Sequence, residues 1–165
     1  MTVQSFEVGV EENVARGKQV LDRVFVPVDY SMSSHRALGV ALELMRTHGS
    51  AVCIFHAAES DPSDDWLGGV GSPAVGGDWA AAALDRLRRF LDNVAPGSSE
   101  RVEVRALVGE PLVMMRRAAR DWGATLVVAP AKVHARFIHS LRTPAERLVH
   151  DSDVPVLVLP AENES

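Results

Sequence analysis

Three cations follow an apolar run near the C-terminal end of the sequence, where an α/β protein often binds phosphate. The segment APAKVHARFIHSLRTPAERL, residues 129–148, begins at the end of the run ATLVVA and contains Lys132, Arg136 and Arg142. Cationic side chains and the free N–H groups at a helix start are the groups that hold phosphate. Phosphate loops are usually built from glycine, however, and this segment has none. The residue types therefore predict either a phosphate site of unusual composition or a site that has lost its ligand.

Apolar runs and helical patterns alternate along the rest of the chain, and they must position this segment. The runs typical of strands are residues 23–28, 51–57, 101–108, 125–130 and 154–159. Helical spacing covers residues 35–47, ending at Gly49, and residues 78–93. A third helix begins at Pro111 and is predicted to bury Leu112, Met115, Ala119 and Trp122; a fourth begins at Thr143, in a Thr-x-x-Glu capping box.

This order predicts an α/β fold: a doubly wound, five-stranded parallel sheet with helices on both faces, of the Rossmann-like type. Ligands of such sheets lie beyond the carboxyl ends of the strands, which singles out residues 27–34, 56–78 and 129–144. Residues 58–78 hold five glycines and two prolines and are predicted to form a long flexible connection. Residues 1–20 show no clear period and are predicted to be an N-terminal extension.

The net charge, the apolar runs and the cysteine count limit the classes of function that this chain can have. The net charge of −5 argues against general affinity for nucleic acid or for an anionic membrane surface, and no apolar run approaches the ~20 residues that span a bilayer. Cys53 is the only cysteine, which fits a reducing compartment. The mixed polar and acidic N-terminus lacks the pattern of a secretory signal. We therefore expect a soluble cytoplasmic protein.

Five stretches in unbroken order resemble one known family. VFVPVDYSMSSHRAL looks like the first strand and turn of the universal stress protein family, in which an Asp ends the strand and Ser residues follow. LVGEPLVMMRRAARDWGATLVVA is similar to the family's Gly-x-Pro helix and next strand, and TPAERLVHDSDVPVLVL to its last helix and strand. The resemblance implies a universal stress protein domain over residues 21–160, with an acidic tail at 161–165.

The resemblance also implies where a nucleotide would bind. The family's nucleotide-site positions correspond to Pro27, Val28, Asp29, Ala57, Ala129, Lys132, Arg142 and Thr143. In nucleotide-binding members the last loop reads Gly, two residues, Gly, nine residues, Gly, then Ser or Thr. Here Ala129, Lys132 and Arg142 stand at the three glycine positions, where side chains obstruct the approach of backbone N–H groups to phosphate. Pro144 removes one more N–H at the helix start.

These departures predict a member of the family that does not bind ATP and has no cofactor. The alternative is a nucleotide-binding switch or slow ATPase, in which Asp29 meets the nucleoside and Lys132, Arg142 and Thr143 hold the phosphates of ATP with Mg²⁺. Asp29 has a second interpretation, as a cap of the turn after its strand. The basic segment 130–142 is either a solvated loop or a site for phosphate or an acidic partner.

Catalytic and metal motifs are not evident. Ser31, Ser33 and Ser34 are good helix-start residues but do not form Gly-x-Ser-x-Gly, and the histidines have no interleaved acids that suit a metal. Cys53 is predicted to be a buried small hydrophobe. We expect a protein that acts through protein contacts, more an interaction module than an enzyme. The family resemblance implies a homodimer paired through the last strand, Val154 to Leu159, whose apolar edge would otherwise invite unwanted pairing.

Overall fold

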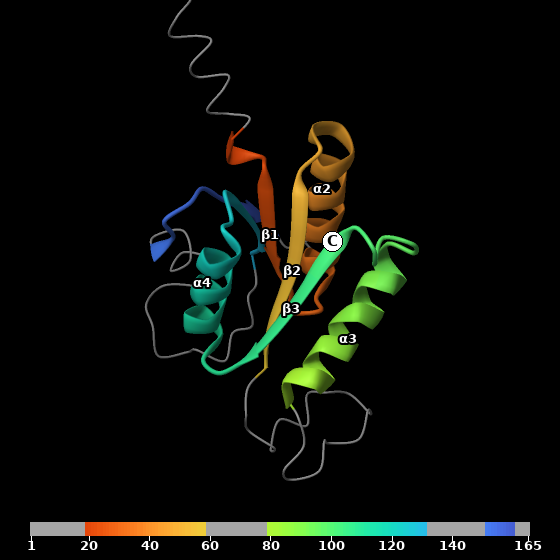
Figure 1. Ribbon diagram of the computed structural model, residues 1–165, viewed down its shortest axis with the longest axis vertical. Helices are drawn as coiled ribbons and strands as arrows, with labels where there is room; N and C mark the ends of the chain where they lie inside the picture. The colour runs from red at the N-terminus through yellow and green to blue at the C-terminus, as the bar shows by residue number, and fades with distance from the viewer. Residues whose placement is uncertain (1–18, 59–78, 132–150, 161–165) are drawn as a thin grey trace, which may run out of the picture.

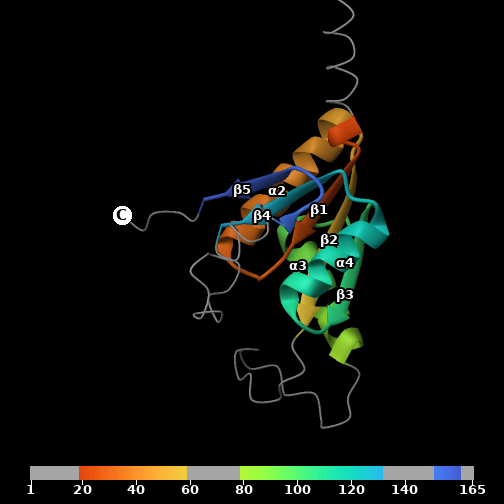
Figure 2. The ribbon, with the colours of Figure 1, turned by 90° about the vertical axis from the view of Figure 1, so that its left-hand side faces the viewer.

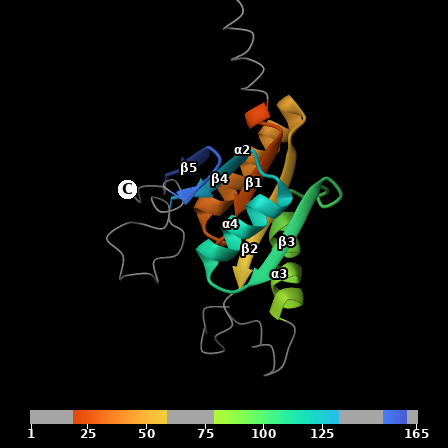
Figure 3. The same cartoon turned by 60° about the vertical axis from the view of Figure 1, so that its left-hand side comes forward.

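The computed structural model describes residues 19–58, 79–131 and 151–160. Five parallel strands form one sheet in the order β3-β2-β1-β4-β5, as Figure 3 shows from β5 at one edge to β3 at the other. The strands are β1 (Arg23–Pro27), β2 (Ala51–Ala58), β3 (Val102–Val108), β4 (Leu126–Pro130) and β5 (Val156–Leu159). The predicted doubly wound parallel sheet is confirmed, with strand ends within two residues of the expected ones.

Helices cover both faces of the sheet. The described helices are α2 (Met32–His48), α3 (Trp79–Val94) and α4 (Pro111–Trp122). In Figure 1 the sheet is seen close to edge-on, with α4 on one side and α2 and α3 on the other. This arrangement follows from right-handed crossovers, because the chain moves outward from β1 to β3 and then returns to β4. The predicted helix at Thr143 and the predicted connection 59–78 lie outside the described residues.

Alternation of side chains along the strands divides the core into two layers. In β1, Val24 and Val26 pack with α2 and α3, whereas Phe25 packs with α4. Phe25 stacks on Phe55 of β2 with ring centroids 5.5 Å apart. Each such fully buried side chain stabilises the fold by roughly 1.5–3 kcal/mol relative to an exposed one. The continuous apolar runs in the sequence therefore reflect strands that are covered on both faces.

The ends of α4 show why the chain folds locally as it does. The Glu110 side chain accepts hydrogen bonds from the N–H groups of Leu112 and Val113, and Pro111 occupies the first turn. Gly123 ends the helix in the left-handed conformation, with φ 74°. The buried face is Leu112, Met115, Ala118 and Trp122. Ala119, which was expected there, lies at the margin of the same cluster, because the two alanines flank the line through Met115 and Trp122.

No helix in the described part of the chain is long and apolar enough to cross a membrane.

Candidate functional site

The carboxyl ends of β1 and β4 meet where the strand order reverses. From β1 the chain runs outward to β2 and β3, and from β4 it runs outward the other way to β5 (Figure 2). An open α/β sheet leaves room for a ligand at this point. Pro27 ends β1, and the Val28 N–H donates to the carbonyl of Phe55 at 2.8 Å, so that Asp29 is the first residue beyond the sheet.

The structure brings five of the eight predicted site residues close to the carboxyl ends of the central strands. Pro27, Val28 and Asp29 come from the end of β1, Ala57 from the end of β2 and Ala129 from β4. Pro27 and Val28 are buried, whereas Ala57 is half-buried. Lys132, Arg142 and Thr143 lie outside the described residues, as do Arg136, His134 and His139 of the basic segment.

Asp29 is a buried carboxylate whose two oxygens differ. Oδ1 accepts three hydrogen bonds, from the Ser31 N–H at 3.0 Å and from the hydroxyl groups of Ser31 and Ser34 at 2.5 Å each. The Asp29 N–H in turn donates to the Ser34 Oγ at 3.0 Å. Oδ2 is buried and accepts no hydrogen bond from any residue that the structure describes.

This geometry is first of all that of a turn cap, the second interpretation given to Asp29 from the sequence. Ser31 is the N-cap of α2, and its side chain accepts from the Ser34 N–H. The two hydroxyl groups donate to a carboxylate instead of to a histidine base, so they are not arranged as activated nucleophiles. The chemistry still open to the site is acceptance of an N–H or O–H donor by Oδ2.

Tyr30 has an unusual backbone. Its φ of 63° makes it the one non-glycine residue in the left-handed region among residues 19–58, 79–131 and 151–160. Its ring lies over the Arg86 guanidinium, 4.1 Å from Cζ, and next to the His56 ring, with centroids 4.7 Å apart. Burial raises the pKa of Tyr30 to about 12 against the opposing effect of Arg86, so the phenol stays neutral.

His56, near the end of β2, anchors this cluster to the backbone. Its Nδ1 lies 2.8 Å from the Val28 carbonyl and donates to it, because a carbonyl can only accept. Burial, helped by the nearby charge of Arg86, lowers the pKa of His56, although the Val28 bond and Asp29 act in the opposite direction. The imidazole is therefore neutral at pH 7.

Sequence reasoning missed both Tyr30 and His56. The available signals were an aromatic residue directly after the strand-ending Asp and a histidine at the end of an otherwise apolar strand. His35, in the first turn of α2, is half-buried and packs edge-on against Phe90, with ring centroids 4.8 Å apart.

Ala129 lies inside the sheet. It is fully buried, pairs with Val158 of β5 and packs in the core layer under α4. The methyl group at this position therefore packs in the hydrophobic core. The ladder also extends beyond the strand, since the Ala131 N–H donates to the Leu159 carbonyl at 2.8 Å.

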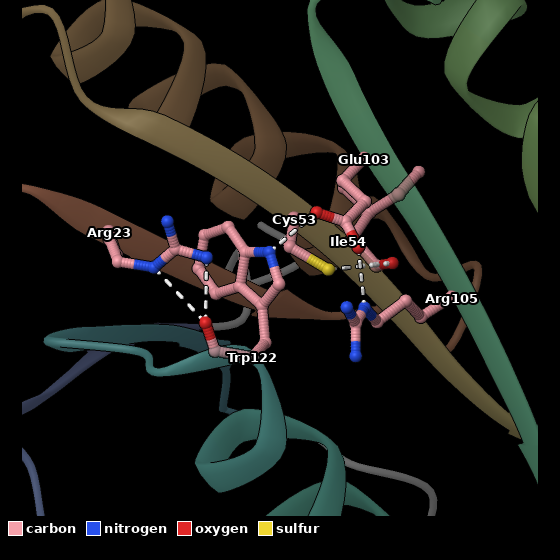
Figure 4. A network of polar contacts seen from close by, with 6 residues as sticks. All are labelled: Arg23, Cys53, Ile54, Glu103, Arg105 and Trp122. Atoms are coloured by element: carbon pink, nitrogen blue, oxygen red, sulfur yellow. Dashed lines mark hydrogen bonds and ion pairs between the residues drawn. The ribbon is translucent and has the colours of Figure 1, made fainter.

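A second polar cluster lies at the opposite, amino end of the sheet (Figure 4). The Trp122 Nε1–H donates to Glu103 at 2.7 Å, and Arg23 stacks on the indole while it donates to the Trp122 carbonyl. Arg105 completes the cluster through Glu103. These hydrogen bonds join β1, β3 and the end of α4. Each of the polar side chains is bonded to another member of the cluster, so we interpret the cluster as structural.

Cys53 lies beneath this second cluster, fully buried. Burial raises the pKa of its thiol to about 12, which makes the thiolate inaccessible at neutral pH. The prediction of a buried small hydrophobe is confirmed. In the described ranges no three His, Cys, Asp or Glu side chains are grouped to hold a metal ion.

Comparison with known proteins agrees with this architecture. A family model described as "Universal stress protein family" matches residues 21–160. Universal stress protein UspA from Lactobacillus plantarum has 20% sequence identity and a TM-score of 0.61, over 84% of this chain and 97% of that one. A universal stress protein family member from Burkholderia pseudomallei has 24% identity and a TM-score of 0.59, over 86% and 98%.

A third solved structure was determined with a nucleotide. The universal stress protein from Archaeoglobus fulgidus in complex with dAMP has 17% identity and a TM-score of 0.53, over 83% of this chain and 96% of that one. At these identities the likeness shows a common fold. No curated protein matches the sequence.

Proposed function

This chain belongs to the universal stress protein family, and we propose from that premise that it is a dimeric stress-response protein that acts through contacts with other proteins and without ATP. The observation that carries the proposal is the residue at position 129, because the family resemblance implies glycine there in nucleotide-binding members and this chain has alanine. Ala129 is fully buried, pairs with Val158 and carries a methyl group, where glycine would leave the backbone bare.

The other sequence departures act in the same direction. Lys132 and Arg142 replace the remaining two glycines, and Pro144 lacks the N–H that a helix start would offer an anion. Asp29, the residue expected at the nucleoside end, already accepts hydrogen bonds from Ser31, the N-cap of α2, and from Ser34. The acidic, single-cysteine chain fits a cytoplasmic protein.

The test is a search for bound nucleotide followed by a titration. Protein purified without added ligand is denatured and the released adenine nucleotide is measured by absorbance; ATP with Mg²⁺ is then titrated by calorimetry. We expect no released nucleotide and no submicromolar binding. The matched variant restores the glycines, A129G/K132G/R142G, and is expected to gain affinity by about tenfold or more if side chains are what blocks the cradle. Submicromolar ATP binding by the unmodified chain would reverse the proposal.

A second candidate function has its own support. The unpartnered Oδ2 of Asp29 at the reversal of strand order, together with the dAMP-bound relative of the same fold, favours a nucleotide-binding switch or slow ATPase. In that case Asp29 meets the nucleoside, while Lys132, Arg142 and Thr143 hold phosphate by charge. Measurable affinity for AMP with weak affinity for ATP would support the nucleoside end of this candidate and exclude the phosphate end.

A further inference from the structure

The left-handed backbone of Tyr30 is strained and must be held by its surroundings. A non-glycine residue in this region costs about 1–2 kcal/mol, because Cβ approaches the carbonyl oxygen. Glycine or asparagine usually occupies such positions. A tyrosine at φ 63° in the turn between β1 and α2 therefore indicates that the ring is fixed strongly enough to offset the strain.

Two elements fix the ring. From β2, the His56 imidazole packs against it and is itself tied to the carbonyl of Val28. From α3, the Arg86 guanidinium lies over one face, and Phe90 meets it edge-on with centroids 5.6 Å apart. The phenol is buried as well. The ring is thus clamped on several sides by residues that are distant in sequence.

The clamp has a direct consequence for Asp29. Because Tyr30 turns the chain in the left-handed sense, the N–H and hydroxyl of Ser31 come back onto Oδ1, where the Ser34 hydroxyl also donates. Three donors saturate Oδ1 and orient the carboxylate, so Oδ2 is the one acceptor left over.

We infer that Tyr30 is a positioning residue: clamped between His56 of β2 and Arg86 and Phe90 of α3, it fixes the Asp29 carboxylate and leaves Oδ2, buried and without a described partner, as the oxygen for a ligand donor. The arrangement joins α3 to the candidate site. It also sets the ligand chemistry, since a carboxylate oxygen accepts an amine or hydroxyl group and repels a phosphate. The ligand part rests on the second candidate function; the positioning of Asp29 does not.

The positioning is tested by amide hydrogen exchange followed by NMR in Tyr30→Phe and Tyr30→Ala. We expect the Ser31 and Ser34 amides of Y30A to exchange about tenfold or more faster than those of the unmodified chain, while Y30F, which keeps the ring, stays close to it. The amides of Val26 and Ile54, in the centre of the sheet, report global stability. An equal rise at all four amides, or Y30F behaving like Y30A, would overturn the inference.

The link to α3 is tested by a matched pair on that helix. Phe90→Leu removes the edge contacts with Tyr30 and with His35 of α2, whereas Leu91→Val changes a neighbouring buried side chain that has no ring contact with either. We expect F90L to raise exchange at Ser31 and Ser34 beyond its effect at Ile54, and L91V to raise all of them alike. Identical profiles for the two variants would show that α3 does not hold the turn.

The ligand chemistry is tested with adenosine and AMP as probes, observed by NMR shifts of residues 29–34. We expect binding to weaken about tenfold in Y30A and to recover in Y30F. If neither probe binds the unmodified chain, the second candidate function and the ligand part of the inference fail together, while the exchange experiment still decides the positioning of Asp29.

Discussion

Burial sets the protonation of the side chains around the turn after β1. His56 is kept neutral by its buried position and by the nearby Arg86, although Asp29 and the Val28 carbonyl favour its charged form. Tyr30 is kept neutral by the same burial. The clamp on the turn therefore contains the neutral rings of Tyr30 and His56 and the cation of Arg86. Acid disturbs this arrangement because protonation of His56 adds a second positive charge near Arg86.

The stability of the fold should decrease with acid through His56. Its pKa is lower in the folded chain than the ordinary 6.5, so the unfolded chain binds more protons once the pH falls below 6.5. The free energy of unfolding should drop between pH 7 and pH 5, and His56→Gln should reduce that drop, by at most about 2 kcal/mol. Urea unfolding at the two pH values measures the difference, and ring NMR signals give the midpoint of His56 itself. A midpoint at or above 6.5 would contradict the prediction.

At the scale of elements, local signals decide where helices begin and end. Ser31 caps α2, which starts at Met32, three residues earlier than its apolar stripe indicates. Gly49 ends the helix at φ 73°, with its N–H on the Met45 carbonyl, as its sequence position predicted. Gly39, in the same helix, has ordinary helical backbone and open space around its Cβ position.

These two glycines should respond to alanine in opposite directions. Gly49→Ala forces a side chain into the left-handed region and should destabilise the chain by about 1 kcal/mol. Gly39→Ala adds a helix-favouring methyl group at an exposed position and should stabilise it by up to about 1 kcal/mol. Thermal and urea unfolding of both variants measures the signs. The same sign for both would show that backbone conformation does not decide the outcome.

At the scale of the whole molecule, the two edges of the sheet differ. The β3 edge carries Glu103 and Arg105, which pair with each other and discourage the approach of another strand. The β5 edge carries only Val and Leu, and Leu157 is 42% exposed. Pro155 and Pro160 bound this apolar edge, so a second copy has the four residues of β5 to pair with. The asymmetry supports the proposed dimer through β5.

Charge at the β5 edge should therefore separate the subunits. Leu157→Asp is expected to convert the protein to a monomer at micromolar concentration, since two copies of the new carboxylate would meet near a twofold axis. Val113→Asp, at a residue of α4 that is 56% exposed, is the matched control and should leave the mass unchanged. Light scattering after size-exclusion chromatography gives both masses. A monomeric unmodified chain, or a dimeric L157D, would exclude pairing through this edge.

The sequence could predict the sheet because its inner strands β1, β2 and β4 are largely buried, which leaves continuous apolar runs such as that of β1. It could also predict Gly49 and Pro111, since caps act within a few residues. It did not indicate the clamp on Tyr30, because His56 and Phe90 lie 26 and 60 residues further along the chain. Such contacts follow from strand order and crossover handedness, not from local spacing.

What the sequence by itself determined about this protein is the alternation of strands and helices, the family resemblance and the absence of glycine from residues 129–148, all of which depend on residue type and short-range periodicity. Only the tertiary structure decided that Ala129 is a core residue and that Asp29 keeps one oxygen saturated and one without a described partner. The reason is physical: burial and hydrogen-bond satisfaction belong to groups that meet in space, and the chain brings them together only when the sheet forms.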